Sequence, residues 1–194
     1  MNLPESKILS IFKETGALLS GHFLLTSGLH SDAYFQCALV FQYPRHAETL
    51  CRAIADHFYQ DEIQLVIAPA VGGIVVGQEI ARLLGVRSVF TERVDGKMTL
   101  RRGFRIHKGE KVLVAEDVTT TGGSVKEVID VVKAGGADPV SVAAVVDRSG
   151  GSINFGIPYF SLLKMNVNNY KPDQCPMCQS GSEPVKPGSR GLKT

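Results

Sequence analysis

The feature that most constrains the fold is a run of four apolar residues, 112–115, followed at once by acidic, polar and glycine residues and then by a helical pattern. A short apolar run bounded by turn residues is typical of a strand buried on both faces. The same order recurs, and we predict strands over 65–68, 87–90, 112–115 and 140–146 and helices over 74–84 and 124–134. Strand, loop and helix units in this order predict an α/β fold, a parallel sheet with helices on both faces.

The two ends of the chain are organised differently. Apolar residues at helical spacing predict helices over 5–15 and 44–58, the second beginning at a proline. Residues 21–43 mix aromatic residues with Gly, Ser and Thr, which favours short strands and turns. Residues 170–194 are rich in Pro and Gly, and we interpret them as an irregular tail. With 194 residues and a prior of about 150 per domain, we expect one domain spanning 1–194.

Composition excludes several classes of protein. Hydrophobic residues make up 44% and charged residues 21% of the chain, a globular balance that argues against wholesale disorder. A net charge of +2 argues against nucleic acid or a membrane surface as a partner of the whole protein. The N-terminus lacks the apolar stretch of a signal peptide, and the four cysteines form no disulfide framework, so we expect a cytoplasmic protein.

The loop after the strand at 112–115 carries the chemistry. Glu116 and Asp117 end the strand, residues 118–123 are rich in Thr and Gly, and a helix is expected to begin at Ser124. A helix N-terminus offers unpaired N–H groups and partial positive charge to a phosphate, and the glycines let the backbone approach it. The acids would repel a bare phosphate and need hydroxyl groups or a metal to engage. A sugar that carries a phosphate and vicinal hydroxyls meets both requirements.

This stretch, 112–124, resembles the ribose-phosphate signature of the type I phosphoribosyltransferases. The resemblance implies their parallel sheet flanked by helices, with a small N-terminal hood over about 1–43. It implies phosphoribosyl pyrophosphate as donor, with Mg²⁺ bound mainly through that substrate and not by protein ligands. Lys97 and Asp117 would be catalytic. The implied donor-binding residues are Arg93, Lys97, Glu116, Asp117, Val118, Thr119, Thr120, Thr121, Gly122, Gly123 and Ser124.

Within that family the chain most resembles the members that act on orotate. Residues 23–31 with Tyr34 and Phe35 are similar to the segment that forms their base pocket. Arg148, just after what we take as the last strand of the sheet, resembles their site for the orotate carboxylate, which suits the two-donor fork of arginine. Thr120 would contact the ring. The implied reaction yields orotidine 5-phosphate and pyrophosphate in de novo pyrimidine (UMP) biosynthesis.

Two further segments resemble parts of the family's site. Val71, Gly72 and Gly73 occupy the place of the pyrophosphate loop, where many orotate enzymes have an aromatic residue, Lys and Gly. Between 93 and 111 lie seven basic residues: Arg93, Lys97, Arg101, Arg102, Arg105, Lys108 and Lys111. This segment resembles the mobile loop that closes over the donor and, in the family's homodimers, reaches the neighbour's site. A solvated basic hairpin is the alternative.

Several interpretations stay open. A phosphoribosyltransferase for another base, such as xanthine or uracil, and an RNA-binding pyrimidine regulator of the same fold are the alternative functions. Cys175 and Cys178 have half the spacing of a zinc site, but no second pair follows, so a structural metal or a site bridging two copies is only an option. The five histidines form no metal-binding motif, and we expect structural or surface roles for His22, His30, His46, His57 and His107.

Overall fold

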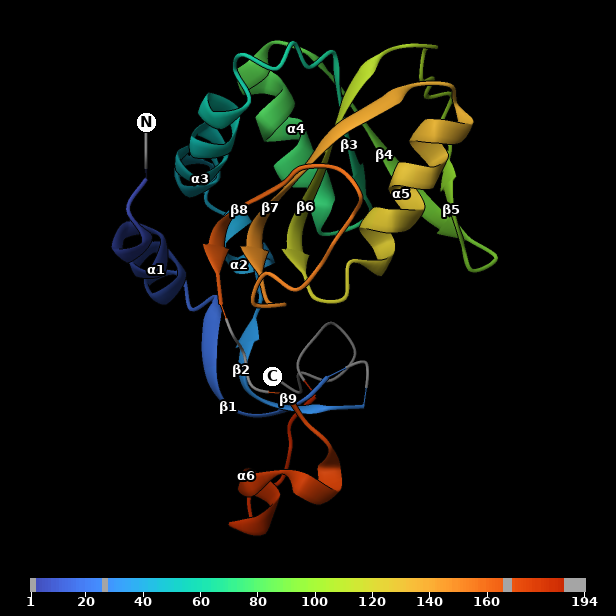
Figure 1. Ribbon diagram of the computed structural model, residues 1–194. Helices are drawn as coiled ribbons and strands as arrows, with labels where there is room; N and C mark the ends of the chain where they lie inside the picture. The colour runs from blue at the N-terminus through green and yellow to red at the C-terminus, as the bar shows by residue number, and fades with distance from the viewer. Residues whose placement is uncertain (1–2, 26–27, 166–168, 187–194) are drawn as a thin grey trace.

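A six-stranded sheet forms the centre of the protein in the computed structural model, which describes residues 3–25, 28–165 and 169–186 (Figure 1). The strand order is β5-β4-β3-β6-β7-β8, and every pair is parallel except β4 with β5. The strands are β3 (Leu65–Pro69), β4 (Arg87–Val94), β5 (Lys97–Leu100), β6 (Lys111–Thr119), β7 (Asp138–Asp147) and β8 (Tyr159–Lys164). The predicted α/β class is confirmed.

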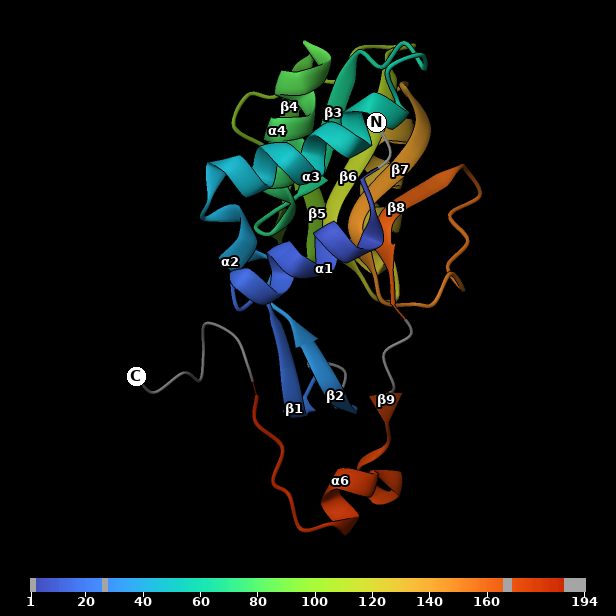
Figure 2. The same cartoon turned by 90° about the vertical axis from the view of Figure 1, so that its left-hand side faces the viewer.

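Helices cover both faces of this sheet (Figures 1 and 2). They are α1 (Glu5–Glu14), α2 (Ala38–Phe41), α3 (Pro44–His57), α4 (Gly73–Leu84) and α5 (Gly123–Ala134). Because side chains alternate along a strand, Val66 packs in one hydrophobic cluster with α1, α3 and α4. Its neighbours Leu65 and Ile67 pack in a second cluster with α5. Both faces of β3 are therefore apolar, which explains why its sequence is an uninterrupted apolar run.

The four predicted helices are confirmed, and every helix end lies within one residue of its predicted position. The four predicted strands are also present, but they are longer than the apolar runs. The loop expected over 118–123 starts later, because β6 continues through Thr119, which pairs with Asp147. Residues 38–41 form the helix α2, where only strands and turns were expected. The prediction that 140–146 is the last strand is wrong. The edge strand β8 follows, and it buries too little of its surface to need a uniformly apolar sequence.

A small antiparallel sheet lies beyond the carboxyl ends of β6, β7 and β8 (Figures 1 and 2). It has the order β1-β2-β9 and consists of β1 (Leu18–Leu24), β2 (His30–Phe35) and β9 (Asn169–Tyr170). We call this sheet the hood. After β9 the tail forms a 3-10 turn (Pro172–Gln174) and a short helix, α6 (Pro176–Gln179), and returns to β1. There Leu24 N–H donates to Val185 O at 2.8 Å. The tail predicted to be irregular is thus packed on the hood as far as it is described; residues 187–194 lie outside the described part.

None of the helices in the described residues is both long enough and apolar enough to cross a membrane.

Candidate active site

The acid pair lies at the carboxyl edge of the main sheet, at the end of β6. Glu116 is buried and Asp117 is partly buried. The carboxylates accept backbone hydrogen bonds: Asp117 N–H donates to Glu116 Oε1 at 3.1 Å, and Val118 N–H donates to Asp117 Oδ1 at 2.8 Å. Burial raises the pKa of both carboxyl groups, and the neighbouring charge of Asp117 raises the pKa of Glu116 further. This edge of the sheet therefore favours a partner that is positively charged or donates hydrogen bonds.

The loop that follows leads directly into the N-terminus of α5. Gly122 is its N-cap residue, with a φ of 74° that other residues rarely adopt. A Cβ atom there would also lie 2.7 Å from the ring of Phe155, so the position requires glycine on two grounds. Residues 116 and 118–125 line a cavity of about 70 Å³ over this helix end. The hydroxyl group of Thr119 is hydrogen-bonded to that of Tyr159, so the Thr119 side chain is buried and points toward β8. Thr120 and Thr121 are exposed.

The turn after β3 packs directly against the acid pair. A Cβ atom at Gly72 would lie 2.6 Å from Asp117 Oδ2, and one at Gly73 would lie 3.1 Å from Glu116 Oε1. The peptide bond between Ala70 and Val71 is cis, and the side chain of Val71 is 81% exposed. The structure thus brings the segment 71–73 and the acid pair together, although they are distant in the sequence.

A larger cavity of about 580 Å³ lies between the acid pair and the hood. Its lining residues are Leu25, Leu29, Tyr34, Phe35, Gln36, Cys37, Asp117, Val118, Thr120, Thr121, Arg148, Ser149, Ser152 and Asn169. Residues predicted for the base and the donor, such as Thr120, Arg148 and Asp117, therefore share one cavity. Tyr34 and Phe35 line it as the resemblance implied, whereas residues 26–27 of that segment lie outside the described part.

Arg148 is the most unusual residue of this cavity. It is only 8% exposed, and its guanidinium lies 5.9 Å from the centre of the Phe35 ring. Nη2 donates a long hydrogen bond of 3.5 Å to Ala33 O, and Nε is buried without a partner among the described residues. Burial lowers the pKa of the guanidinium, but an arginine remains charged at neutral pH. A buried charge with unused donors favours an anionic ligand in the cavity.

The basic segment is partly a hairpin, the alternative left open above. Strands β4 and β5 pair through a two-residue turn in which Asp95 and Gly96 both have positive φ, as tight hairpins require. Arg93 forms a two-pronged ion pair with Glu127 of α5, at 2.8 and 3.0 Å. Arg102 and Lys111 are paired with Glu92 and Glu62. Lys97 is exposed and forms no ion pair with any described residue.

Some lining residues were not predicted. Ser149 and Ser152 follow Arg148 in a loop, and Cys37 lies at the start of α2. Asn169 belongs to β9, just before the tail, which the sequence presents as a segment apart from the catalytic loop. Their type carries no signal of this role, because serine and asparagine are common in loops everywhere. Only the way that the hood and tail fold over the sheet brings them to the cavity.

The arrangement defines a class of protein, one that binds a phosphorylated sugar beside an acid pair at the edge of a parallel sheet. Comparison with known families agrees: residues 42–178 match the model described as "Phosphoribosyl transferase domain". The matched part is more than half of the chain. The chain therefore belongs to the phosphoribosyltransferase family.

Similar proteins narrow the class further. The chain is 56% identical over 186 residues to an orotate phosphoribosyltransferase of Desulforamulus reducens, covering 96% of this chain and 97% of the relative. It is 50% identical over 190 residues to one of Caldanaerobacter subterraneus subsp. tengcongensis, covering 98% and 100%. Within the family, the chain belongs with the orotate phosphoribosyltransferases.

Solved structures agree on the fold. A crystal structure of an orotate phosphoribosyltransferase from Aeropyrum pernix superposes with a TM-score of 0.71 at 23% identity, covering 81% of this chain and 93% of that one. An adenine phosphoribosyltransferase from Thermoanaerobacter pseudethanolicus gives a TM-score of 0.61 at 16% identity, covering 69% and 88%. Because enzymes for different bases share this fold, the fold alone does not select the base.

Proposed function

We propose that this chain transfers ribose 5-phosphate from phosphoribosyl pyrophosphate to N1 of orotate, in the cavity between the acid pair and the hood. The observation that carries the choice of site is Arg148, a buried guanidinium with unused donors that shares this cavity with Asp117 and Thr120. Orotate is a planar carboxylate, which an arginine fork binds through two parallel hydrogen bonds. The strong similarity to orotate enzymes supports the same choice.

The donor occupies the loop and the acid pair. In this proposal the N–H groups at the start of α5 and the hydroxyl groups of Thr120, Thr121 and Ser124 bind the 5-phosphate. Glu116 and Asp117 accept hydrogen bonds from the ribose hydroxyls. Thr119 contributes through its backbone, since its hydroxyl group is already bonded to Tyr159. Backbone groups of Val118, Gly122 and Gly123 complete the loop.

The reaction breaks the bond between C1 of the ribose and the pyrophosphate oxygen, which leaves with the electron pair. A new bond forms between C1 and N1 of orotate, and the N1 proton is released to the departing pyrophosphate or to water. Positive charge builds on the ribose ring in the transition state, and the carboxylates at the sheet edge stabilise it because they are buried and already in place. Arg148 and Thr120 hold orotate in line with C1, so much of the rate enhancement comes from orientation.

The leaving group lies against the turn 71–73 and the basic hairpin. In this proposal Lys97, which forms no ion pair with a described residue, contacts the pyrophosphate, and Arg93 becomes available once it leaves Glu127. Mg²⁺ bound to the donor would supply neutralisation of charge on the pyrophosphate. The acid pair suits a cation nearby, because each carboxyl group has a raised pKa that a positive charge would lower.

We further propose that the enzyme is a cytoplasmic homodimer in which the 1–194 chain acts as one catalytic domain and the basic hairpin reaches the partner's site. Two observations support a dimer. The apolar side chains of Val71 and Val75 are 81% and 45% exposed near the turn 71–73. A cavity beside Val75 is lined in part by Phe41, Pro44 and Ile74. Exposed apolar side chains that gather beside an apolar-lined cavity are typical of an interface.

The experiment is the loss of orotate's ultraviolet absorbance on addition of phosphoribosyl pyrophosphate. We expect loss that requires Mg²⁺ and that orotate supports far better than uracil or xanthine. Equal or better turnover of another base would overturn the choice of orotate. Absence of turnover with every base, together with tight salt-dependent RNA binding, would favour a regulator of the same fold.

A further inference from the structure

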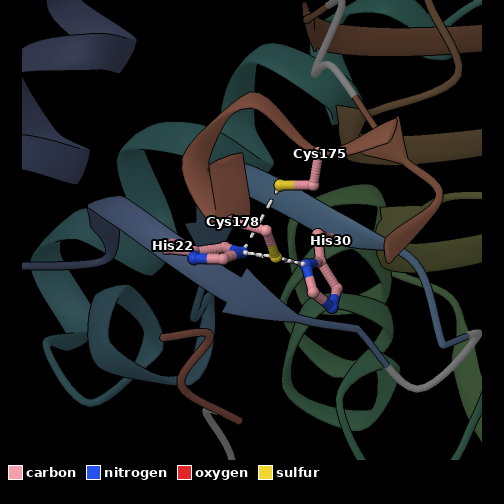
Figure 3. A group of neighbouring side chains, drawn as sticks. All are labelled: His22, His30, Cys175 and Cys178. Carbon is pink, nitrogen blue, oxygen red and sulfur yellow. Dashed lines mark hydrogen bonds between the residues drawn. The ribbon is translucent and has the colours of Figure 1, made fainter. Parts of the chain in front are cut away.

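Four metal-binding side chains meet between the hood and the tail. They are His22 of β1, His30 at the start of β2, Cys175 just before α6 and Cys178 within it (Figure 3). One ligand atom from each lies within 4.8 Å of all the others, and all but Cys178 are buried. The whole main sheet lies between the two pairs in the sequence, and none of the four residues is among those that line the cavity between the acid pair and the hood.

The distances fit a tetrahedral ion. With Zn–S near 2.3 Å and Zn–N near 2.0–2.1 Å, a sulfur and a nitrogen ligand of one tetrahedral zinc lie about 3.6 Å apart. Cys175 Sγ is 3.5 Å and Cys178 Sγ is 3.7 Å from His22 Nε2, and Cys178 Sγ is 3.3 Å from His30 Nδ1. His22 Nε2 and His30 Nδ1 are 2.8 Å apart, a hydrogen-bond distance that an ion would widen by about half an ångström.

A further contact orients the first histidine. His22 Nδ1 lies 3.0 Å from the backbone oxygen of Ser182. Because a carbonyl oxygen only accepts, His22 donates its Nδ1 proton there, and in the neutral ring the lone pair of Nε2 then points into the cluster. Histidines that bind zinc in proteins are commonly oriented through the second nitrogen in this way.

The tail also needs a source of stability. Among its described residues, 169–186, none belongs to either hydrophobic cluster of the protein. At its start the stretch is β9 of the hood, which pairs with β2 (His30 with Tyr170 and Ser31 with Asn169), and backbone hydrogen bonds around Val185 hold its other end to β1. An 18-residue stretch with so little apolar burial resembles the small segments that depend on a metal for folding.

We propose that His22, His30, Cys175 and Cys178 form a structural zinc site that fastens the tail to the hood. A set of two thiolates and two imidazoles in a closed tetrahedron selects Zn²⁺ over hard cations such as Mg²⁺ and leaves no open position for catalysis. Binding releases one proton from each cysteine thiol and changes no oxidation state. The tail also carries Asn169 and β2 carries Tyr34 and Phe35, so the site supports one wall of the base cavity.

The first measurement is the metal content of the full-length protein after zinc-supplemented expression and gel filtration. We expect about one zinc ion per chain by inductively coupled plasma mass spectrometry. Cys178→Ser, which alters the most exposed ligand, is expected to lose it. Cys51→Ser is the control, because Cys51 is a thiol of α3 outside the cluster that donates to Val76 O, and serine can donate there as well. It should keep its zinc.

The second measurement works on the wild-type chain alone, so it stands even where a variant fails to fold. Cobalt(II) added to zinc-stripped protein should produce thiolate-to-cobalt absorption that saturates at one ion per chain. Removing zinc with a chelator should lower the melting temperature by at least about 5 °C, and zinc should restore it. Zinc below about a tenth of an ion per chain with no cobalt absorption, iron in its place, or full zinc in Cys178→Ser would each overturn the site.

Discussion

At the scale of single residues, the burial of Arg148 gives the clearest indication of its role, because burying a charged side chain costs free energy. A guanidinium that is 8% exposed, with one long hydrogen bond and a buried Nε, is poorly compensated by the protein itself. The carboxylate of orotate would supply the missing acceptors. Among the described residues, the fold therefore leaves this charge without an ion pair, which is what a site for an anionic substrate requires.

We predict that Arg148→Lys raises the KM for orotate about 10- to 100-fold, with little change in the KM for phosphoribosyl pyrophosphate. Lysine keeps the charge but loses the fork, and a hydrogen bond to a charged group contributes about 1.5–3 kcal/mol. Steady-state kinetics with each substrate varied in turn gives both constants. Arg52→Lys, on the exposed face of α3, is the control. An unchanged orotate KM would remove Arg148 from the base site.

Asp117→Asn separates activity from stability. Its raised pKa means that the folded state binds the proton more tightly than the unfolded state. The charged form therefore destabilises the fold, and this effect grows as the pH rises through the raised pKa. We predict a melting temperature about 2–4 °C higher for Asp117→Asn at pH 8 and a smaller gain at pH 5. We also predict a turnover that is roughly 100-fold lower.

Calorimetry and kinetics on the same samples test both predictions, the higher melting temperature and the lower turnover. Asn keeps an oxygen that accepts the Val118 N–H, so local geometry is preserved. Asp130→Asn, on the exposed face of α5, controls for loss of one negative charge. Full activity in Asp117→Asn, or an unfolded variant, would contradict the role assigned to the pair.

The residues that the sequence could reveal were those that act from one continuous stretch. The positions 116–124 carry their own context, a buried strand before and a helix after, so their place at the sheet edge was predictable. His22, His30, Cys175 and Cys178 were not predictable as a group, and the expectation of separate structural or surface roles for the two histidines missed their convergence. Each pair is only half of a ligand set, and strand pairing across the hood brings the halves together.

At the scale of elements, the basic hairpin shows what charge counting along a sequence leaves out. Only Asp95 and Glu110 oppose the seven basic residues within the segment itself. In the fold, Glu127 of α5, Glu92 of β4 and Glu62 provide carboxylates from outside the segment. Within the described part of the chain, three of the seven basic residues are thus ion-paired, and the local excess of positive charge is smaller than the sequence suggests.

We predict that Glu127→Gln lowers the KM for phosphoribosyl pyrophosphate by up to about fivefold. The exposed ion pair with Arg93 contributes about 0–1 kcal/mol, and this is what the pyrophosphate must overcome to recruit that arginine. Glu62→Gln, which frees Lys111 instead, is expected to leave this KM unchanged. Donor saturation curves at low salt measure both, since salt screens exposed charges. The same KM for phosphoribosyl pyrophosphate in wild type and Glu127→Gln would mean that Arg93 stabilises the hairpin and does not bind the pyrophosphate.

At the scale of the whole molecule, the parallel sheet was predictable because its central strands β3, β6 and β7 are mostly buried and therefore contain apolar runs. Short strands were expected over 21–43, and the resemblance implied a hood there, but the pairing of β2 with β9 from the other end of the chain was not predictable. Burial of β8 at the edge is likewise partial. Elements that are stabilised mainly by distant partners leave a weak pattern in their own sequence.

The shared active site is testable by mixing two inactive variants. Lys97→Ala removes the exposed lysine of the hairpin. Asp117→Asn removes one carboxylate of the acid pair, which in this proposal shares a site with the hairpin of the partner chain. If the hairpin serves the partner's site, a hybrid dimer has one site with both changes and one site with neither. Random exchange makes half of the dimers hybrids, so the mixture should recover about one quarter of the wild-type rate per site.

The recovery should appear only after subunits exchange, and it should reach its limit as the two variants approach equal amounts. Sedimentation of the wild type checks that dimers exist at the assay concentration. Each variant alone sets the background. Activity that stays at this background, in a mixture shown by mass spectrometry to contain hybrids, would place Lys97 and Asp117 of one chain in the same site. The hairpin would then close over its own sheet edge, beside α5, where the pair of Arg93 with Glu127 already holds it.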